Sequence, residues 1–195
     1  MLRNVFHLII LLLISFSLIG CVAQSNTLSI EPNITLPTQD LSIRAVSINI
    51  ISIDKRRSTA LAEINRNGRL AVLKPSRDLR YLLQEALEKQ MIARGFTVSA
   101  PANINLQIAL NNLYANVQEG SLRHNITIDV VITLVAMASN GSTSTRSYIR
   151  SYNEQGPLHA SNGKIANAIN KVLTDIITDM ANDSETSRFI KQNSQ

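Results

Sequence analysis

The sequence predicts an α+β fold: an antiparallel sheet with two main helices packed on one face, preceded by a signal peptide and a flexible tether. Apolar residues alternate with polar ones over several segments, as they do in strands with one buried face. Two other segments carry the apolar stripe of an amphipathic helix. These helices follow hairpins instead of alternating with every strand, which favours an antiparallel sheet over a parallel one.

Residues 1–20 have the pattern of a lipoprotein signal peptide that is cleaved on export, with Arg3 ahead of an apolar run from Val5 to Ile19. At about 1.5 Å per helical residue, this run covers roughly 22 Å, less than a hydrocarbon core of about 30 Å, so a permanent transmembrane helix is disfavoured. The run ends in Leu18-Ile19-Gly20-Cys21, which resembles the lipobox of bacterial lipoproteins. That resemblance implies a covalent diacylglyceryl and N-acyl lipid on Cys21.

The residue after the cysteine predicts which of the two membranes holds the protein. The lipobox resemblance implies that an aspartate at this position would retain the protein in the inner membrane, as in enterobacterial lipoproteins. This chain has Val22 there instead. We therefore expect a Gram-negative outer membrane, with the domain facing the periplasm and several acyl chains holding it stably. Because Cys21 is the only cysteine, the chain can form neither a disulfide within itself nor a thiolate metal site. The alternative is a chance cysteine at the end of an ordinary signal.

Residues 21–41 are predicted to be the lipidated cysteine and a flexible tether, because they are rich in Ser, Asn, Thr and Gln and contain two prolines. As a coil, ~20 residues reach about 25 Å on average, which keeps the domain near its membrane. Ile30, Ile34 and Leu36 alternate, so an edge strand at the end of the tether is the alternative. Residues 42–195 are expected to form a single periplasmic α+β domain.

The domain is expected to open with a strand over residues 43–53. A hairpin with an Asn67-Gly68 turn follows, and Pro75 ends it. A helix over residues 77–94 comes next, with Ser76 as its N-cap and Gly95 as its left-handed exit. The predicted inward stripe of this helix is Leu79, Leu82, Leu83, Ala86 and Leu87.

Three successive antiparallel strands are predicted next. The first covers residues 103–117, where the apolar phase changes at Asn111 and Asn112 and indicates a β-bulge. Residues 122–137 return as a strand with a clean alternation. Residues 143–152 form a polar edge strand, with Arg146 and Arg150 to discourage pairing between edges. A helix over residues 161–181 and a short one near 185–191 complete the chain.

Several segments carry a resemblance to a known family. Residues 73–96, LKPSRDLRYLLQEALEKQMIARGF, resemble the signature segment of the YajG-type bacterial lipoproteins. Similar segments follow that family's order at residues 33–37, 105–108, 151–156 and 189–193, and around Tyr114. The resemblance implies a small lipoprotein of the Gram-negative envelope, without an established catalytic site.

The residues indicate no catalytic centre. His124 and His159 are the histidines that remain after signal cleavage, and Ser161, near His159, is better explained as a helix cap. The chain contains no G-x-S-x-G, no H-E-x-x-H and no glycine-rich phosphate loop. Asp175, Asp179 and Asp183 recur at i,i+4, but helical carboxylates alone make a poor cation cage, so we expect a solvated face, no metal and no cofactor.

Positive charge gathers in one stretch of the sequence. Between residues 55 and 80 lie eight cationic and two anionic side chains, an excess of six in a chain whose total is +5. Such a surface suits an anionic envelope component or an acidic protein partner, and the alternative is a solvated surface with no partner. Nucleic acid is disfavoured by the compartment and by the few stacking aromatics. The cations are Lys55, Arg56, Arg57, Arg66, Arg69, Lys74, Arg77 and Arg80.

The sequence therefore predicts a non-catalytic binding or assembly module of the cell envelope, attached to the outer membrane through its lipid, with the basic stretch as its contact surface. Two alternatives stay open. One is an enzyme acting on cell-wall material, in which His159 would be essential. The other is a carrier of lipids or hydrophobic ligands, which requires an apolar cavity between sheet and helices.

Overall fold

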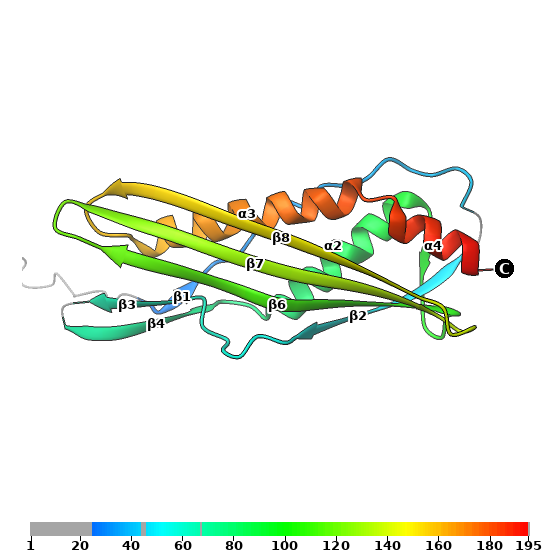
Figure 1. Ribbon diagram of the computed structural model, residues 1–195, viewed down its shortest axis with the longest axis horizontal. Coiled ribbons are helices and arrows are strands. Elements are labelled where there is room, and N and C mark those ends of the chain that lie inside the picture. The colour runs from blue at the N-terminus through cyan, green and yellow to red at the C-terminus, as the bar shows by residue number, and fades with distance from the viewer. Residues whose placement is uncertain (1–24, 44–45, 67, 195) are drawn as a thin grey trace, which may run out of the picture.

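A long, twisted sheet with helices on one face and a small second sheet at one end make up the elongated molecule (Figure 1). This computed structural model describes residues 25–43, 46–66 and 68–194. In chain order the elements are β1 (Thr27–Leu28), β2 (Ser47–Asp54), β3 (Ala62–Arg66), β4 (Arg69–Pro75), α2 (Leu79–Arg94), β5 (Thr97–Val98), β6 (Ile104–Glu119), β7 (Arg123–Ala138), β8 (Thr143–Pro157), α3 (Asn162–Asn182) and α4 (Glu185–Asn193).

The α+β class is confirmed, but the large sheet is mixed and not purely antiparallel. Its order is β5-β2-β6-β7-β8. Strands β6, β7 and β8 are antiparallel, as predicted, whereas β2 runs parallel to both β5 and β6. Between β2 and β6 the chain makes a long excursion through β3, β4 and α2, and this crossover makes a parallel pair possible. Alternation in β2 indicates a buried face but says nothing about strand direction.

The second sheet has the order β1-β4-β3. The predicted hairpin is confirmed, since β3 pairs antiparallel with β4 up to Arg66 and Arg69, and Gly68 has φ +79. Asn67 lies outside the described residues. The Ala115 N–H donates to the Leu61 carbonyl oxygen at 2.7 Å, which joins this hairpin to the long strand β6.

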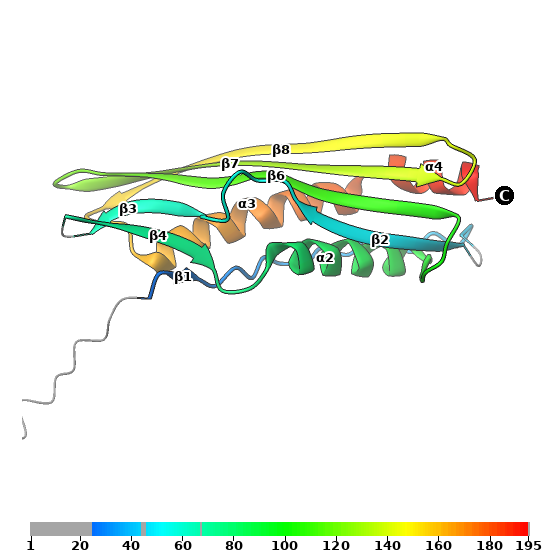
Figure 2. The ribbon, with the colours of Figure 1, turned by 90° about the horizontal axis from the view of Figure 1, so that it is seen from below.

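Helices α2 and α3 lie on the same face of the large sheet, as predicted (Figure 2). The space between helices and sheet is filled by one continuous cluster of buried, mostly aliphatic side chains. The cluster includes Leu82, Leu83, Leu106, Ile128, Ile169 and Leu173.

Helix α2 begins two residues later than predicted. Asp78 is its N-cap, with an extended backbone and a carboxylate that accepts from the Arg80 N–H, so Ser76 does not cap the helix. Carboxylates are N-cap residues as good as serine, and the residue that meets the first free N–H groups decides the start. The predicted exit at Gly95 is confirmed by its φ of 110°. The predicted stripe is buried, and Met91 joins it.

Other predicted details of the second half are confirmed. The register of β6 against β7 shifts between Leu110 and Asn112, which is the expected bulge. Ser161 caps α3 by accepting from the Lys164 N–H. Strand β8 lies at the sheet edge but runs five residues further than predicted, to Pro157, opposite Arg123.

The part of the predicted tether that the structure describes, residues 25–41, packs on the domain. Thr27 and Leu28 pair with β4, and Leu28 and Ile30 are only 1% and 0% exposed. The N–H of Asn33 donates to Thr174 of α3 at 3.0 Å. These hydrogen bonds and the buried Leu28 and Ile30 side chains attach residues 25–41 to the folded unit. The alternation had indicated an edge strand at Ile30, Ile34 and Leu36. The strand lies earlier, at Thr27–Leu28, and although Ile30 is buried, Leu36 is exposed.

The signal peptide at residues 1–20, Cys21 and the first residues after it lie outside the described structure. Among the helices that the structure describes, none is long and apolar enough to cross a membrane.

Candidate functional site

An open depression of about 670 Å³ lies where the end of β2, the end of β4 and the start of α2 meet. Half of the predicted basic residues line it, namely Arg56, Lys74, Arg77 and Arg80. Asp54 and Asp78 line it as well. We call this depression the basic groove.

Three of the four cations offer their charge to solvent at the mouth of the groove. Arg77 and Arg80 are about half exposed, and Lys74 is exposed. Arg80 binds Asp78 at 2.6 Å, and this hydrogen bond holds the pKa of the Asp78 carboxyl below its ordinary value. Arg77 is 3.5 Å from Glu85, a long contact that leaves most of its donors available. The groove can thus present several donors to an anionic group.

The fourth cation, Arg56, is a structural residue. Its side chain is only 5% exposed and meets Asp54 at 2.8 Å, and it also donates to the Leu113 carbonyl oxygen. Burial alone would raise the pKa of Asp54, but the hydrogen bonds from Arg56 bring that pKa below its ordinary value. Arg56 therefore joins β2 to β6. Its guanidinium donors are engaged by Asp54 and Leu113, so few are free for a ligand.

Asp54 and Asp78 are partners of the basic stretch that its charge count alone does not predict, although a signal for them exists in the sequence. Both stand two residues before an arginine, in Asp54-Lys55-Arg56 and Asp78-Leu79-Arg80, and both pairs form ion pairs. The two carboxylates lower the positive charge of the groove and orient the guanidinium groups. An anionic ligand would meet positioned donors instead of a diffuse cationic surface.

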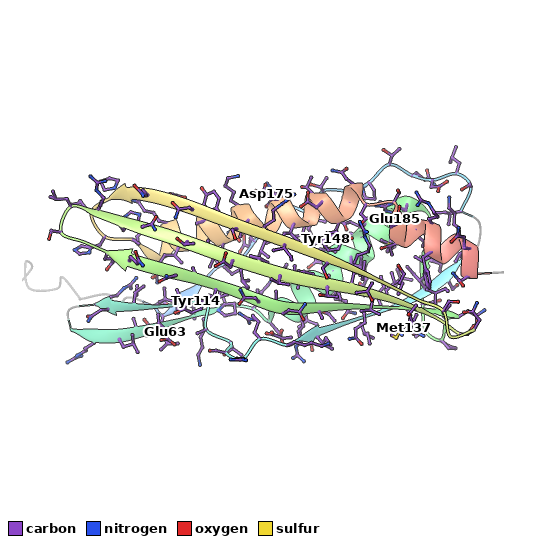
Figure 3. The ribbon with its side chains drawn as sticks, viewed as in Figure 1. Glu63, Tyr114, Met137, Tyr148, Asp175 and Glu185 are labelled. Atoms are coloured by element: carbon purple, nitrogen blue, oxygen red, sulfur yellow. The ribbon has the colours of Figure 1, made fainter. Side chains whose placement is uncertain are left out.

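The other predicted cations lie elsewhere, so the eight do not form one surface. Lys55 is exposed just after β2. Arg57 lines a smaller depression of about 300 Å³ together with Tyr114, which Figure 3 shows on β6 above the β3–β4 hairpin. Arg66 and Arg69 end the paired strands at the tip of that hairpin, and Arg66 donates to Asn162 at the start of α3.

Of the candidate catalytic residues, His124 and Ser161 make structural contacts, whereas His159 is largely exposed. His159 is 78% exposed and lies 3.5 Å from Glu119, while Ser161 caps α3. His124 is buried, and its Nδ1 is 2.9 Å from the Leu158 carbonyl oxygen. These contacts tie the turn after β6 to the loop before α3.

The three aspartates near the end of α3 each face a cation. Asp175 is paired with Lys171, Asp179 with Arg150 and Asp183 with Arg146, the last two pairs joining α3 to the edge strand β8. The hydroxyl group of Tyr148 also donates to Asp183. Tyr148 belongs to β8, and Figure 3 labels it beside α3. Among the described residues, no group of three or more His, Cys, Asp or Glu side chains could hold a metal ion.

Comparisons with known proteins agree with the resemblance read from the sequence segments. The model of a family described as "Uncharacterized lipoprotein" matches residues 32–191. Two curated proteins, both described as uncharacterized lipoprotein YajG, from Escherichia coli K12 and from Escherichia coli O6:H1, are each 46% identical over 180 residues, covering 92% of this chain and 94% of theirs. A crystal structure of protein XCC0632 from Xanthomonas campestris superposes with a TM-score of 0.60 at 12% identity, over 86% of this chain and 99% of that one.

Proposed function

The chain belongs to a family of uncharacterized lipoproteins, and from this premise we propose that it is a non-catalytic binding or assembly module held at the periplasmic face of the outer membrane. The lipid on Cys21 is the anchor. The motif Leu18-Ile19-Gly20-Cys21 supports this role, and Val22 after the cysteine favours the outer membrane. Two or more acyl chains on one residue give stable attachment.

The basic groove is the proposed contact surface. Lys74, Arg77 and Arg80 are the cations that present donors at its mouth, and Asp78 orients Arg80. Their arrangement is the single observation that carries the proposal, because it suits a phosphate or carboxylate group of an envelope component or an acidic protein surface. No cofactor is part of this proposal.

The anchor is tested by metabolic labelling. Cells producing the full chain are fed radiolabelled palmitate, and membranes are separated by density. We expect the label on the protein in the outer-membrane fraction, and Cys21→Ser should lose both the label and the membrane association. An unlabelled protein that fractionates with soluble proteins would contradict the anchor.

The groove is tested by crosslinking in cells. A photoactivatable amino acid replaces Ser76, which lines the groove, or Ser139, an exposed serine near the β7–β8 turn, as the matched position. A discrete adduct is expected from position 76 alone. Lys74→Glu with Arg77→Glu should abolish it, because the ligand would meet negative charge.

Lys171→Glu with Arg188→Glu changes the net charge equally, at exposed helical cations whose partners lie outside the groove, and should leave the adduct intact. Thermal unfolding of all variants checks that the fold is kept. An adduct that survives reversal of the groove charges, or that forms equally from position 139, would remove the groove as a contact surface.

A further inference from the structure

The described structure begins at Ser25, just before β1. Figure 1 shows β1 beside the β3–β4 hairpin, toward the end of the long axis where β6 turns into β7. The side-chain amide of Asn162 donates to the Ser25 carbonyl oxygen at 2.6 Å, and its oxygen accepts from Arg66. Ser25 is therefore held beside the start of α3 and the tip of the β3–β4 hairpin. Because the contacts are specific, the entry point has a defined position on the molecule.

Little chain separates this point from Cys21. Four residue steps lie between them. Even fully extended, a residue spans at most about 3.6 Å, so Ser25 stays within about 14 Å of the lipidated cysteine. This step rests on the proposed function, because it needs the lipid on Cys21. An acylated residue lies at the membrane surface, so this end of the domain has to face the bilayer.

The same end exposes large apolar side chains. Leu122, in the turn after β6, is 80% exposed, and Leu158, in the loop before α3, is 64% exposed. The Leu158 N–H donates to the Leu122 carbonyl oxygen at 3.0 Å, so the two leucines are held next to each other. Leu158 has φ 58, a conformation that is uncommon for a leucine. Leu70, at the hairpin tip, is 67% exposed.

Basic side chains accompany the leucines. Arg69 and Arg123 are exposed, and Lys164 is half-buried. None of these three pairs with a carboxylate in the part of the chain that the structure describes. The Glu119 carboxylate at this end is engaged, since it accepts from the Ala160 N–H and lies beside His159. The combination of exposed leucines and unpaired cations is typical of surfaces that bind anionic lipid interfaces.

We propose that this end of the domain docks on the anionic lipid surface of its own membrane, with Leu122 and Leu158 at the boundary between headgroups and acyl chains. Arg69, Arg123 and Lys164 contact lipid phosphates. The lipid anchor and the docked end then act together, because the anchor keeps the weak surface contact at high local concentration. The long axis points away from the bilayer, and the β7–β8 turn at the opposite end faces the periplasm.

The absence of tryptophan from the sequence allows a direct test. Leu122→Trp places one fluorophore at the docking end, and Ile92→Trp places one at a matched exposed position, 58% exposed on α2. The mature acylated protein is reconstituted into vesicles of phosphatidylethanolamine and phosphatidylglycerol with brominated acyl chains. We expect the fluorescence of Leu122→Trp to be quenched about threefold more strongly than that of Ile92→Trp, since only position 122 reaches the acyl boundary.

Charge reversal separates docking from anchoring. Added to Leu122→Trp, the changes Arg69→Glu, Arg123→Glu and Lys164→Glu together should bring its quenching down to that of Ile92→Trp, while the protein still floats with the vesicles. Lys89→Glu, Lys171→Glu and Arg188→Glu are the matched control, at cations that pair within their own helices, and should leave quenching unchanged.

Equal quenching of the two tryptophans in protein that floats with the vesicles would overturn the docking proposal and leave the anchor standing. Protein that fails to float would overturn the anchor itself, and the docking proposal with it. Circular dichroism of each variant confirms that its secondary structure is kept.

Discussion

The side-chain amide of Gln90 donates a hydrogen bond to the Ile177 carbonyl oxygen at 2.7 Å, although Gln90 is completely buried. The same nitrogen donates to the Thr35 carbonyl oxygen at 3.0 Å. One polar side chain of α2 therefore joins α3 and the N-terminal segment. Together with the buried Ile30, it makes residues 25–41 part of the domain, which brings the domain close to its proposed anchor.

Gln90→Leu should lower the free energy of unfolding by about 1–3 kcal/mol, because the buried Ile177 carbonyl oxygen and the partly buried Thr35 carbonyl oxygen lose this donor. Urea denaturation followed by circular dichroism measures the change. Gln84→Leu is the control, since the Gln84 amide bonds only Glu88 within the same helix, and it should change stability by less than about 0.5 kcal/mol. If Gln90→Leu is as stable as the wild type, the hydrogen bonds of Gln90 are not needed for the stability of the fold.

Ile30→Ala should cost about 2–5 kcal/mol, because the side chain is fully buried and its removal leaves a cavity. Leu36→Ala is the matched control from the same segment, because Leu36 is 57% exposed. Its effect should stay within about 0.5 kcal/mol. If both variants unfold at the same urea concentration as the wild type, the segment behaves as a tether and does not pack as described.

Arg56→Ala should destabilise the domain by about 2 kcal/mol, because it leaves the mostly buried Asp54 carboxylate without its charged donor. Arg57→Ala, one residue further along and exposed, should be close to neutral. Thermal unfolding of the two variants side by side distinguishes them. Equal melting temperatures would argue against a structural role for Arg56.

Asp183 should make the free energy of unfolding depend on pH in the acid range. Burial alone would raise its pKa, but the Glu185 N–H, Arg146 and Tyr148 donate to its carboxylate and hold the pKa below the ordinary value. A lowered native pKa stabilises the fold above the unfolded pKa of about 3.9, and this contribution is lost as the pH falls through the native pKa. Asp183→Asn should therefore lose stability at pH 7 and little at strongly acidic pH.

Urea midpoints of wild type and Asp183→Asn, taken from neutral pH down through the acid range, measure this difference. Asp175→Asn, at an exposed carboxylate on the same helix, is the control, and its midpoints should follow those of the wild type at every pH. Parallel curves for Asp183→Asn and wild type would contradict a special role for Asp183.

Much of the fold could be predicted because its elements depend on local patterns. Alternation along β7 from Ile126 to Leu134, the change of phase at Asn111 and Asn112, and Gly95 after α2 all correspond to features of the structure. The start of α2 was predicted two residues early, because Ser76 and Asp78 are both good caps and only the geometry selects one. The candidate site was predicted less well, since four of the eight cations line the groove.

By itself, the sequence determined the strands, the helices, the buried side chains of the stripes and the family, because each of these depends on residue type and spacing along the chain. Only the tertiary structure decided that β2 runs parallel to β6, that Ile30 is in the core, that Arg56 is buried against Asp54, and that Ser25 lies beside Asn162. Those relationships join residues that are distant in sequence or depend on burial. Periodicity records which side of an element is buried, but not what packs against it.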